Sequence, residues 1–380
     1  MTATNTGGDA PFDPVDGWHM RTALGLAARG LGRVWPNPAV GCVLVGGEDG
    51  RIVGRGWTAP GGRPHAETQA LARAGGDARG ATAYVTLEPC AHHGETPPCA
   101  DALVAAGIAR AVIAIKDPDP RVSGRGIAAL EAAGIKVVTG VCGPEAEQLN
   151  AGYLLCQTAG RPLVLLKTAT GLDGRIATRT GQSRWITGAA ARARGHLLRA
   201  QFDAILVGAG TVAADDPDLT CRLPGLDDRS PVRVVLDSAL RTSPDAKVIA
   251  TARETPTWVI AARAAERSRA TALIEAGAEV IEVTADAHGR PTVDAVLQAL
   301  AERGITRLLV EGGSGVAAAF VRAGRVDRLA WFRAARLLGG DGLAAIGPLA
   351  LEAPGDGPAF RRTRVIDLGQ DVLETYALVA

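Results

Sequence analysis

The chain has 380 residues, of which 47% are hydrophobic and 4% aromatic, and its formal net charge is +1. Its length predicts two domains, or three, with cores built mainly from Ala, Val and Leu. Because the charge is close to zero, there is no electrostatic reason to expect a nucleic acid or an anionic membrane as a partner.

The cysteine content and the lack of a targeting signal indicate a reducing compartment. No charged segment followed by an apolar stretch opens the chain, and no apolar run of about 18 residues occurs in it. Metal-bound or free thiols in the cytoplasm therefore fit better than a disulfide framework. The cysteines are Cys42, Cys90, Cys99, Cys142, Cys156 and Cys221.

The first half of the chain alternates between short apolar runs and amphipathic stretches. Residues 1–13 are expected to be a disordered tail, and Asp13-Pro14 supplies a helix cap and a first helical residue. Strands are expected at 40–45, 52–56, 82–86, 111–115 and 135–138. Helices are expected at 14–30, 65–74, 98–107, 127–133 and 144–158. This alternation predicts an α/β domain over residues 14–160.

The segment Gly160-Arg161-Pro162 breaks a helix directly before a new strand, and it predicts the domain boundary. The second domain, residues 161–380, is expected to be a larger α/β domain. Its strands are expected at 163–167, 204–207, 232–236, 247–250, 280–283, 307–310 and 327–332. Its helices are expected at 188–201, 263–277, 292–303 and 314–323.

His65, Cys90 and Cys99 form the most distinctive chemical set in the chain. One imidazole and two thiolates suit Zn²⁺ better than Mg²⁺ or Ca²⁺, and three protein ligands leave a fourth tetrahedral position for water. Glu67, two residues after the histidine, can reach that water and move its protons without binding the metal. In the expected layout the histidine and both cysteines lie where loops meet helices, and a helix N-terminus favours thiolate over thiol.

A closed structural zinc site, with His92 or His93 as the fourth ligand, is the alternative. A lone His or Cys is also more often a packed core residue than a ligand. Neither explanation accounts for Glu67 or for the proline before Cys90. His-x-Glu followed by Pro-Cys and a second Cys is the signature of the zinc nucleobase deaminases, so the pattern favours a catalytic zinc.

The first half resembles the deaminase half of the bifunctional riboflavin-biosynthesis deaminase–reductases. The resemblance rests on the long spacing between Cys90 and Cys99 and on the strings PNPAVGC at 36–42 and VTLEPC at 85–90. It implies a cytidine-deaminase-like three-layer domain. Two positions of the implied substrate pocket depart from the family pattern: Thr58 stands where His is frequent, and Glu95 stands where Lys or Arg is common.

Two glycine-rich segments of the second half could hold a nucleotide. Residues 204–213 (AILVGAGTVA) imitate a Rossmann turn, but Asp215-Asp216-Pro217 and Leu223-Pro224-Gly225 leave no room for the full crossover helix of a Rossmann unit. Residues 308–315 (LLVEGGSG) predict a strand, a tight turn and a helix start, a geometry that can cradle phosphate on backbone N–H groups. Glycines at such a place often merely end a strand, so both readings stay open.

The second half resembles the reductase half of the same family, whose fold is like dihydrofolate reductase and whose cofactor is NADPH. The strings that carry the resemblance occur in family order: LDGRIA at 172–177, SRWIT at 183–187, LRA at 198–200, GTVAADDPDLTCR at 210–222, VVLDS at 234–238 and EGG at 311–313. The resemblance implies NADPH contacts at Ala169, Trp185, Thr211, Asp215, Ser238, Gly313, Ser314, Gly315, Val316, Ala317, Ala318 and Ala319. It implies substrate contacts at Ser183, Arg199, Leu219, Arg222 and Glu311.

Together the two resemblances imply an enzyme for two consecutive steps of riboflavin synthesis. The zinc site would deaminate 2,5-diamino-6-ribosylamino-4(3H)-pyrimidinone 5′-phosphate, and NADPH would then reduce the ribosyl side chain to give 5-amino-6-ribitylamino-uracil 5′-phosphate. Arg199 and Arg222 offer planar forks for the ribose phosphate. A homo-oligomer is expected from the family.

Two alternatives are left open, and the second belongs to a different class. One is a zinc deaminase of another nucleobase or nucleoside with an appended nucleotide-binding domain. The other is a non-catalytic module that binds zinc and a nucleotide.

Overall fold

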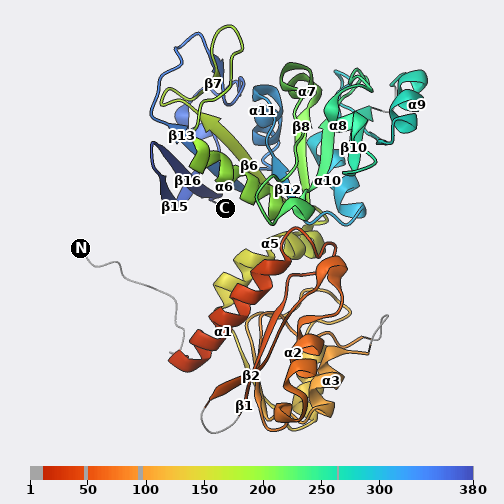
Figure 1. The fold of residues 1–380 in the computed structure, drawn as a ribbon, viewed down its shortest axis with the longest axis vertical. Coiled ribbons are helices and arrows are strands. Elements are labelled where there is room, and N and C mark those ends of the chain that lie inside the picture. The colour runs from red at the N-terminus through yellow and green to blue at the C-terminus, as the bar shows by residue number, and fades with distance from the viewer. Residues whose placement is uncertain (1–11, 47–49, 93–96, 263–264, 380) are drawn as a thin grey trace. The chain divides into compact units, whose positions relative to one another are not determined.

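The computed structural model describes residues 12–46, 50–92, 97–262 and 265–379, and it forms two compact units, Met1–Thr158 and Ala159–Ala380 (Figure 1). Most of the predicted tail, residues 1–11, lies outside the described residues. Within the described part of the chain, no helix is both long and apolar enough to cross a membrane.

The first unit is a five-stranded sheet with helices on both faces. The strands follow the order β2-β1-β3-β4-β5; β1 and β2 form an antiparallel hairpin, β1 is also antiparallel to β3, and β3, β4 and β5 are parallel. The strands are β1 (Gly41–Gly46), β2 (Arg51–Trp57), β3 (Thr82–Val85), β4 (Arg110–Ile113) and β5 (Lys136–Thr139). The helices are α1 (Pro14–Ala27), α2 (Ala66–Ala74), α3 (Cys99–Ala105), α4 (Arg125–Ala132) and α5 (Gly143–Ala159).

Glycines in the hairpin let helices α1 and α2 pack closely on opposite faces of the sheet. A Cβ on Gly41 would lie 1.9 Å from the carbonyl oxygen of Ala23 in α1, and one on Gly56 would lie 2.0 Å from that of Ala66 in α2. Gly56 pairs with Cys42, the neighbour of Gly41, so these two glycines point to opposite faces. A larger residue at either position would push a helix off the sheet, and α2 carries the candidate proton shuttle.

Every helix and strand predicted for the first half is found, within a few residues of its expected bounds. The start of α1 shows why. Asp13 Oδ1 accepts the N–H of Val15 at 2.9 Å, and Pro14 occupies the first helical position, as the sequence predicts.

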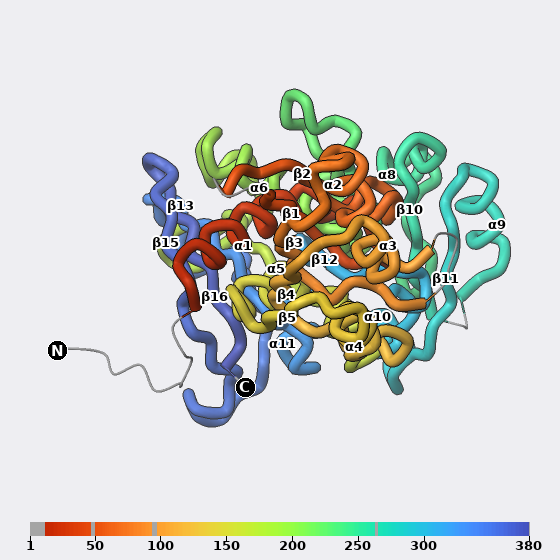
Figure 2. The backbone as a smooth tube through the Cα atoms, turned by 90° about the horizontal axis from the view of Figure 1, so that it is seen from below, coloured from red at the N-terminus to blue at the C-terminus, as the bar shows by residue number. Residues whose placement is uncertain are grey.

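The second unit is built on a nine-stranded sheet of order β11-β10-β9-β8-β12-β6-β13-β16-β15. Figures 1 and 2 place β10, β11 and α9 at one end of this unit and β13, β16 and β15 at the other. The strands are β6 (Leu163–Thr170), β7 (Arg175–Ala177), β8 (Ala204–Gly208), β9 (Val232–Leu236), β10 (Thr257–Ala262), β11 (Glu279–Val283), β12 (Arg307–Val310), β13 (Arg328–Ala334), β14 (Leu343–Ala344), β15 (Phe360–Leu368) and β16 (Asp371–Leu378). The helices are α6 (Ala189–Ala200), α7 (Ala209–Asp215), α8 (Lys247–Ala250), α9 (Arg267–Glu275), α10 (Val293–Glu302) and α11 (Ser314–Arg322).

The strands from β11 to β13 in this order are all parallel, so their carboxyl ends meet at one edge of the sheet. In open α/β sheets this edge is where ligands bind. Between β8 and β9 only the seven-residue helix α7 forms, and Asp216 then turns the chain with a φ of 39°. The unit therefore lacks the full crossover helix of a Rossmann fold, as the sequence predicts.

The strand predicted at 247–250 is wrong, because this segment is helix α8. Its Val248 and Ile249 are fully buried, and an apolar run this short has no periodicity that separates a helix from a strand. Strand β10 was not predicted, and neither were β7, β14 and helix α7. The C-terminal hairpin of β15 and β16 was also missed, since β15 is mostly exposed and is held by pairing with β16 rather than by an apolar face.

Candidate active sites

The three predicted metal ligands converge in the first unit. His65 precedes α2 as its N-cap, Cys99 is the first residue of α3, and Cys90 lies in the loop after β3. His65 Nδ1 lies 3.7 Å from Cys90 Sγ and 3.3 Å from Cys99 Sγ, and the three ligand atoms lie within 4.8 Å of one another. Bond lengths to tetrahedral zinc would separate a sulfur and a nitrogen ligand by about 3.5 Å, so the set fits this metal.

Cys90 differs from the prediction in one respect: it lies in a loop and not at a helix start. Its thiolate is favoured instead by direct contacts. Hydrogen bonding with Cys99 and with His65 lowers the pKa of Cys90 to about 4, and the backbone N–H of Cys99 donates to its sulfur at 3.3 Å. The hydrogen bond with Cys90, together with burial, raises the pKa of Cys99, and a bound zinc ion would favour the thiolate form of both sulfurs.

Glu67 is buried in the first turn of α2 and lines the same cavity as His65 and Cys90, of about 260 Å³. Burial, with the nearby charge of Cys90, raises the pKa of Glu67 to about 7. A carboxyl group with such a pKa can both take and give a proton near neutral pH, which is what a general acid–base group needs.

His92 also lines this cavity, but it is not part of the three-residue cluster of potential ligands found among the described residues. His93 lies outside the described residues. The described residues thus give no fourth ligand for a closed structural site, and the catalytic interpretation of the metal site is retained.

Thr58, which stands where the family often has His, forms hydrogen bonds with the backbone in the cavity wall. Thr58 is buried, its hydroxyl accepts the N–H of Val40 at 2.9 Å, and it donates to the carbonyl oxygen of Pro38 at 3.1 Å. It therefore ties the segment that carries Asn37 to the cavity wall. Glu95, the other departure, lies outside the described residues.

A buried carboxylate anchors the loop that carries Cys90. Glu88 accepts four backbone N–H groups, from Asp117, Gly124, Gly126 and Ile127, at 3.0 to 3.3 Å. Buried charges are tolerated where hydrogen bonds satisfy them, so this network fixes the loop independently of a metal. Sequence reasoning gave Glu88 no role of its own, because its partners are backbone groups and leave no side-chain pattern.

The second unit contains a cavity of about 880 Å³ at the carboxyl ends of β6, β8 and β12. It gathers many of the positions implied by the family resemblance: Ala169, Ser183, Trp185, Arg199, Thr211, Asp215, Arg222, Glu311, Gly313, Gly315, Val316 and Ala317. Five positions do not line it. Leu219 and Ala318 are buried, Ser314 and Ala319 lie on α11, and Ser238 lines a separate hollow of about 500 Å³.

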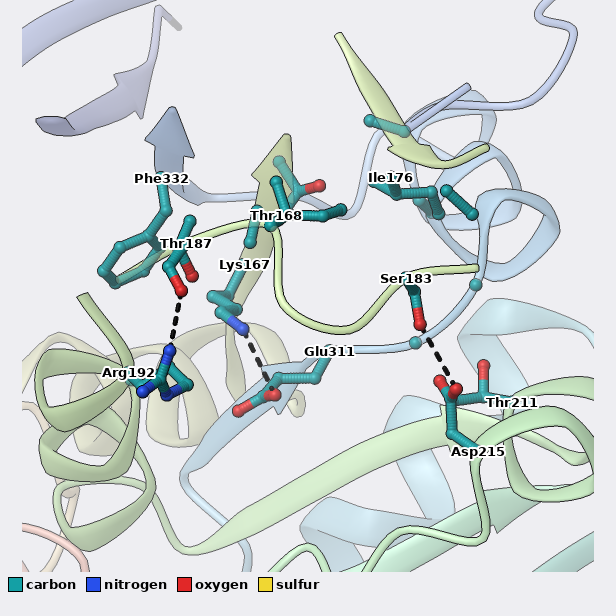
Figure 3. Close-up of a pocket in the computed structure, with 18 of the residues that line it drawn as sticks. Lys167, Thr168, Ile176, Ser183, Thr187, Arg192, Thr211, Asp215, Glu311 and Phe332 are labelled. Atoms are coloured by element: carbon teal, nitrogen blue, oxygen red, sulfur yellow. Dashed lines mark hydrogen bonds and ion pairs between the residues drawn. The ribbon is translucent and has the colours of Figure 1, made fainter. Parts of the chain in front are cut away.

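Three charged side chains meet in the floor of this cavity, as Figure 3 shows in part. Glu311 accepts two hydrogen bonds from the fork of Arg199, both at 2.9 Å, and lies 3.4 Å from Lys167 Nζ. Although burial opposes ionisation, Arg199 and Lys167 hold the pKa of Glu311 well below its usual range. Lys167 was not predicted; the signal was a lysine directly after the apolar run that opens strand β6.

The segment of residues 183–187 borders the cavity and is held at several points (Figure 3). Ser183 Oγ lies 3.4 Å from Asp215 Oδ1, and Arg192 donates to the carbonyl oxygen of Thr187 at 2.8 Å. The Arg192 guanidinium also lies 4.6 Å from the ring centre of Trp185, whose side chain is 64% exposed. A flat aromatic face is therefore presented at the cavity, where a planar ring could stack.

The glycine turn after β12 brings two backbones unusually close. A Cβ on Gly312 would lie 2.5 Å from the Cα of Val207, and Gly313 has a φ of 51°. Glycine is required at both positions for these different reasons. The turn leads into the N-terminus of α11 beside the cavity, a setting that suits a phosphate group.

Comparisons with known proteins match both units. A model of the cytidine and deoxycytidylate deaminase zinc-binding region matches residues 14–115, and a model of the RibD C-terminal domain matches residues 162–373. The riboflavin biosynthesis protein RibD of Escherichia coli is 43% identical, over 94% of this chain and 98% of that protein. RibD of Bacillus amyloliquefaciens is 42% identical, over 94% and 95%.

Solved structures of RibD proteins are similar to this chain over nearly its whole length. A RibD structure from Acinetobacter baumannii is 38% identical, with a TM-score of 0.86, over 97% of this chain and 99% of that one. The diaminohydroxyphosphoribosylaminopyrimidine deaminase/5-amino-6-(5-phosphoribosylamino)uracil reductase of Thermotoga maritima is 37% identical, with a TM-score of 0.84, over 96% and 99%. The cytidine-deaminase-like and dihydrofolate-reductase-like domains expected from the sequence are thus confirmed, and the chain belongs to the RibD family of riboflavin-biosynthesis deaminase–reductases.

Proposed function

We propose that this chain deaminates 2,5-diamino-6-ribosylamino-4(3H)-pyrimidinone 5′-phosphate at its metal site and reduces the ribosyl group of the product in the cavity of the second unit. The observation that carries the proposal is the open three-ligand set with a buried carboxyl group in the same small cavity. A module that only binds zinc and a nucleotide would not need a proton-transfer group beside the metal. A deaminase of free nucleosides has no use for a second unit with a reductase cavity.

In the first unit, His65, Cys90 and Cys99 would hold zinc. Zinc at such a site makes a bound water acidic near neutral pH. Glu67 takes a proton from the water molecule as the water oxygen bonds to the amine-bearing carbon. It then gives a proton to the amine nitrogen as the C–N bond breaks and ammonia leaves. The wall of the cavity contributes Asn37, Thr58 and Asp117, which shape the space for the pyrimidine.

In the second unit, NADPH supplies the hydride when it is bound, and the protein orients the two reactants. Lys167 and Arg199 keep Glu311 ionised in the cavity floor. An ionised carboxylate accepts hydrogen bonds from sugar hydroxyls, so Glu311 is suited to orient the ribosyl group. Trp185 and the turn at Gly313 are suited to the nicotinamide and to a phosphate respectively.

The hollow at Ser238 is suited to the other end of the cofactor. Ser238 and Thr284 follow β9 and β11, and Ala262 is the last residue of β10, so this hollow and the main cavity lie at the same edge of the sheet. Strand β10 is three strand spacings from β12, about 14 Å at the usual spacing, which an extended dinucleotide can span. Arg269 lines the hollow and pairs with Glu266 at 2.9 Å; turned from Glu266 to the ligand, its guanidinium group would suit a 2′-phosphate.

The proposal divides the chain into a deaminase domain at 14–160 and a reductase domain at 161–380. The two compact units support this division. We also infer a cytoplasmic location, supported by the six cysteines, all in the described part of the chain and none in a disulfide. The partner is a small pyrimidine ribose phosphate, and the family leads us to expect a homo-oligomer.

The test is to supply the purified, zinc-loaded protein with the diaminopyrimidine phosphate and to follow ammonia release and NADPH oxidation separately. Ammonia release without NADPH, and oxidation of NADPH only after deamination, is the expected result. Ammonia release from cytidine or guanine at a higher kcat/KM than from the diaminopyrimidine phosphate would favour the other deaminases instead. No turnover of either kind, with zinc bound, would support a binding module.

A further inference from the structure

One face of helix α6 is lined by basic side chains. Arg192, His196 and Arg199 are spaced by four and three residues, so they lie on the same side of the helix, and all three line the large cavity of the second unit. Arg199 was implied as a substrate contact by the family resemblance. His196 was not singled out by the sequence and has no part in the chemistry described above.

His196 is tied to the loop that supplies Arg222. The backbone N–H of Arg222 points at His196 Nδ1 from 3.3 Å, and the carbonyl oxygen of Thr220 lies 3.2 Å from the same nitrogen. Arg199 Nη1 already donates to that carbonyl oxygen at 3.0 Å. The two contacts at Nδ1 require different tautomers of the ring. We assign Nδ1 as the acceptor of the Arg222 N–H, because Arg199 already donates to the Thr220 oxygen. In this tautomer the neutral ring carries its proton on Nε2.

Nε2 has no hydrogen-bond partner among the described residues, and it is not among their buried unpaired atoms. Nε2 is therefore not sealed from solvent, and His196 lines the cavity. A single N–H donor is thus offered at this point of the wall, held in orientation by the bond at Nδ1.

The two neighbouring arginines, Arg199 and Arg222, differ in how fully their guanidinium groups are hydrogen-bonded within the protein. The fork of Arg199 is taken up by Glu311, with two bonds of 2.9 Å, and by Thr220. Among the described residues, the Arg222 side chain contacts Asp218 at 3.2 Å and Thr220 Oγ1, and it is 51% exposed. An incoming anion can therefore recruit Arg222 readily, whereas Arg199 would first have to leave Glu311.

We propose that His196 donates from Nε2 to the 5′-phosphate of the ribosyl substrate, together with Arg222, and so makes the reductase site selective for phosphorylated over dephosphorylated substrate. This assignment rests on the proposed reductase function. Arg199 then acts as a positioning residue that holds Glu311 and the loop at Thr220.

The electrostatics of the site agree with an anionic ligand. Burial, together with Arg199 and Arg222, lowers the pKa of His196, while the carbonyl of Thr220 and Glu311 act in the opposite direction. Cations thus outweigh anions around the ring. A phosphate dianion placed there meets an N–H donor and a recruitable arginine fork, and charge-assisted hydrogen bonds of this kind are among the stronger ones in proteins.

Two variants separate the two nitrogens of the ring. His196→Gln places an amide N–H near the position of Nε2 and keeps the donor, whereas His196→Asn keeps a polar group near Nδ1 and removes the donor. His288→Asn, in an exposed loop outside the cavity, is the matched control. Melting curves establish that each variant is folded.

The first measurement is calorimetric binding of ribose 5-phosphate and of ribose, without cofactor or turnover. We expect His196→Asn to weaken binding of ribose 5-phosphate by about 10- to 100-fold, the usual effect of one hydrogen bond to a charged group. His196→Gln should lose much less, and neither variant should change the binding of ribose. The same pattern should appear in the KM for reduction of phosphorylated and dephosphorylated substrate, with kcat little changed.

Three outcomes would overturn the assignment: unchanged ribose 5-phosphate binding in His196→Asn, equal losses for ribose 5-phosphate and ribose, or equal losses in both variants. The last two would mean that His196 only positions the loop. If the wild-type protein binds ribose 5-phosphate through His196 but reduces no substrate, the proposed function fails while the assignment of His196 stands.

Discussion

Among single residues, Cys90 offers the cleanest test of the metal site. It lies in a loop and its main contacts are with His65 and Cys99, so its replacement disturbs little else. We expect Cys90→Ser to lose most of its zinc, measured by metal analysis of the purified protein, because a serine hydroxyl is a poor zinc ligand. Cys156→Ser, on α5 of the same unit, should keep one zinc per chain. Full occupancy in Cys90→Ser would contradict the ligand assignment.

Glu67 can be separated from the metal by an isosteric change. Glu67→Gln preserves the volume of this buried side chain but removes its ability to take up a proton. We expect zinc content to stay at the wild-type level and deamination to fall by about 10²- to 10⁴-fold, the usual effect of a positioned acid–base group. Loss of zinc together with activity would show that Glu67 is a ligand or a structural residue.

The ion pair between the buried Asp16 and the partly exposed Arg110 predicts a stability that depends on pH. The hydrogen bond from Arg110 lowers the pKa of Asp16, so the ionised carboxylate stabilises the fold above its unfolded pKa of about 3.9, and this contribution is lost as the pH falls through the lower folded pKa. Asp16→Asn should lower the free energy of unfolding at pH 7 by about 3 kcal/mol. The difference from wild type should shrink below pH 4.

The measurement is urea unfolding of the metal-free wild-type and variant proteins at pH 7 and at pH 3.5. Asp77→Asn is the control, because Asp77 pairs with Arg51 at 3.7 Å while both side chains are more than 60% exposed. An equal loss of stability for Asp16→Asn at pH 7 and pH 3.5 would mean that packing, and not charge, is responsible.

The sequence predicts single residues well where the chemistry is carried by residue type. His, Cys and Glu at set spacings mark the metal site of the first unit, and the structure brings the three predicted ligands, His65, Cys90 and Cys99, together. Lys167 and His196 were not predicted as site residues, because a single basic residue in a sequence is usually a solvated surface group. Their significance appears only when Glu311 and the loop at Arg222, distant in the sequence, are placed beside them.

At the scale of helices and strands, the edge of the large sheet where the carboxyl ends of its parallel strands meet predicts a preference for NADPH over NADH. Arg269, in the first turn of α9, lines the Ser238 hollow and donates to the carbonyl oxygen of Ala239 at 3.3 Å. If it meets the 2′-phosphate, Arg269→Ala should raise the KM for NADPH by about 10-fold and leave that for NADH unchanged. Arg267→Ala, in the same turn but outside the hollow, should change neither value. Equal changes for NADPH and NADH would refute this role of the hollow.

Elements were predicted correctly where their own residues determine them. Strand β12 and the helix start after Gly313 follow from an apolar run and a glycine turn, and both are confirmed. Helix α8 and strand β15 depend on tertiary context: the first is a buried single turn, and the second has exposed arginines and is held by its partner strand. Local sequence carries little of that information.

For the whole molecule, the separation of the two sites predicts independent half-reactions. The predicted zinc ligands lie in the unit Met1–Thr158, and the large cavity lies in the unit Ala159–Ala380. Glu67→Gln should therefore reduce pre-deaminated substrate at the wild-type rate. Arg222→Ala should raise the KM for reduction and spare deamination, since a contact made equally in ground and transition states mainly affects binding.

Kinetics of each half-reaction on separately supplied substrate are the measurement. If either variant, while still folded, loses both activities, the two reactions share one active site and the two-site description is wrong.

The four backbone hydrogen bonds to Glu88 have a consequence for how the enzyme meets a changing supply of metal. They hold the loop of Cys90 through the chain's own amides, so we expect the first unit to keep its fold without zinc, unlike a zinc finger. A cell starved of zinc would hold an intact protein that still reduces and no longer deaminates. When zinc returns, deamination resumes by filling a waiting site, with no need for new synthesis or refolding.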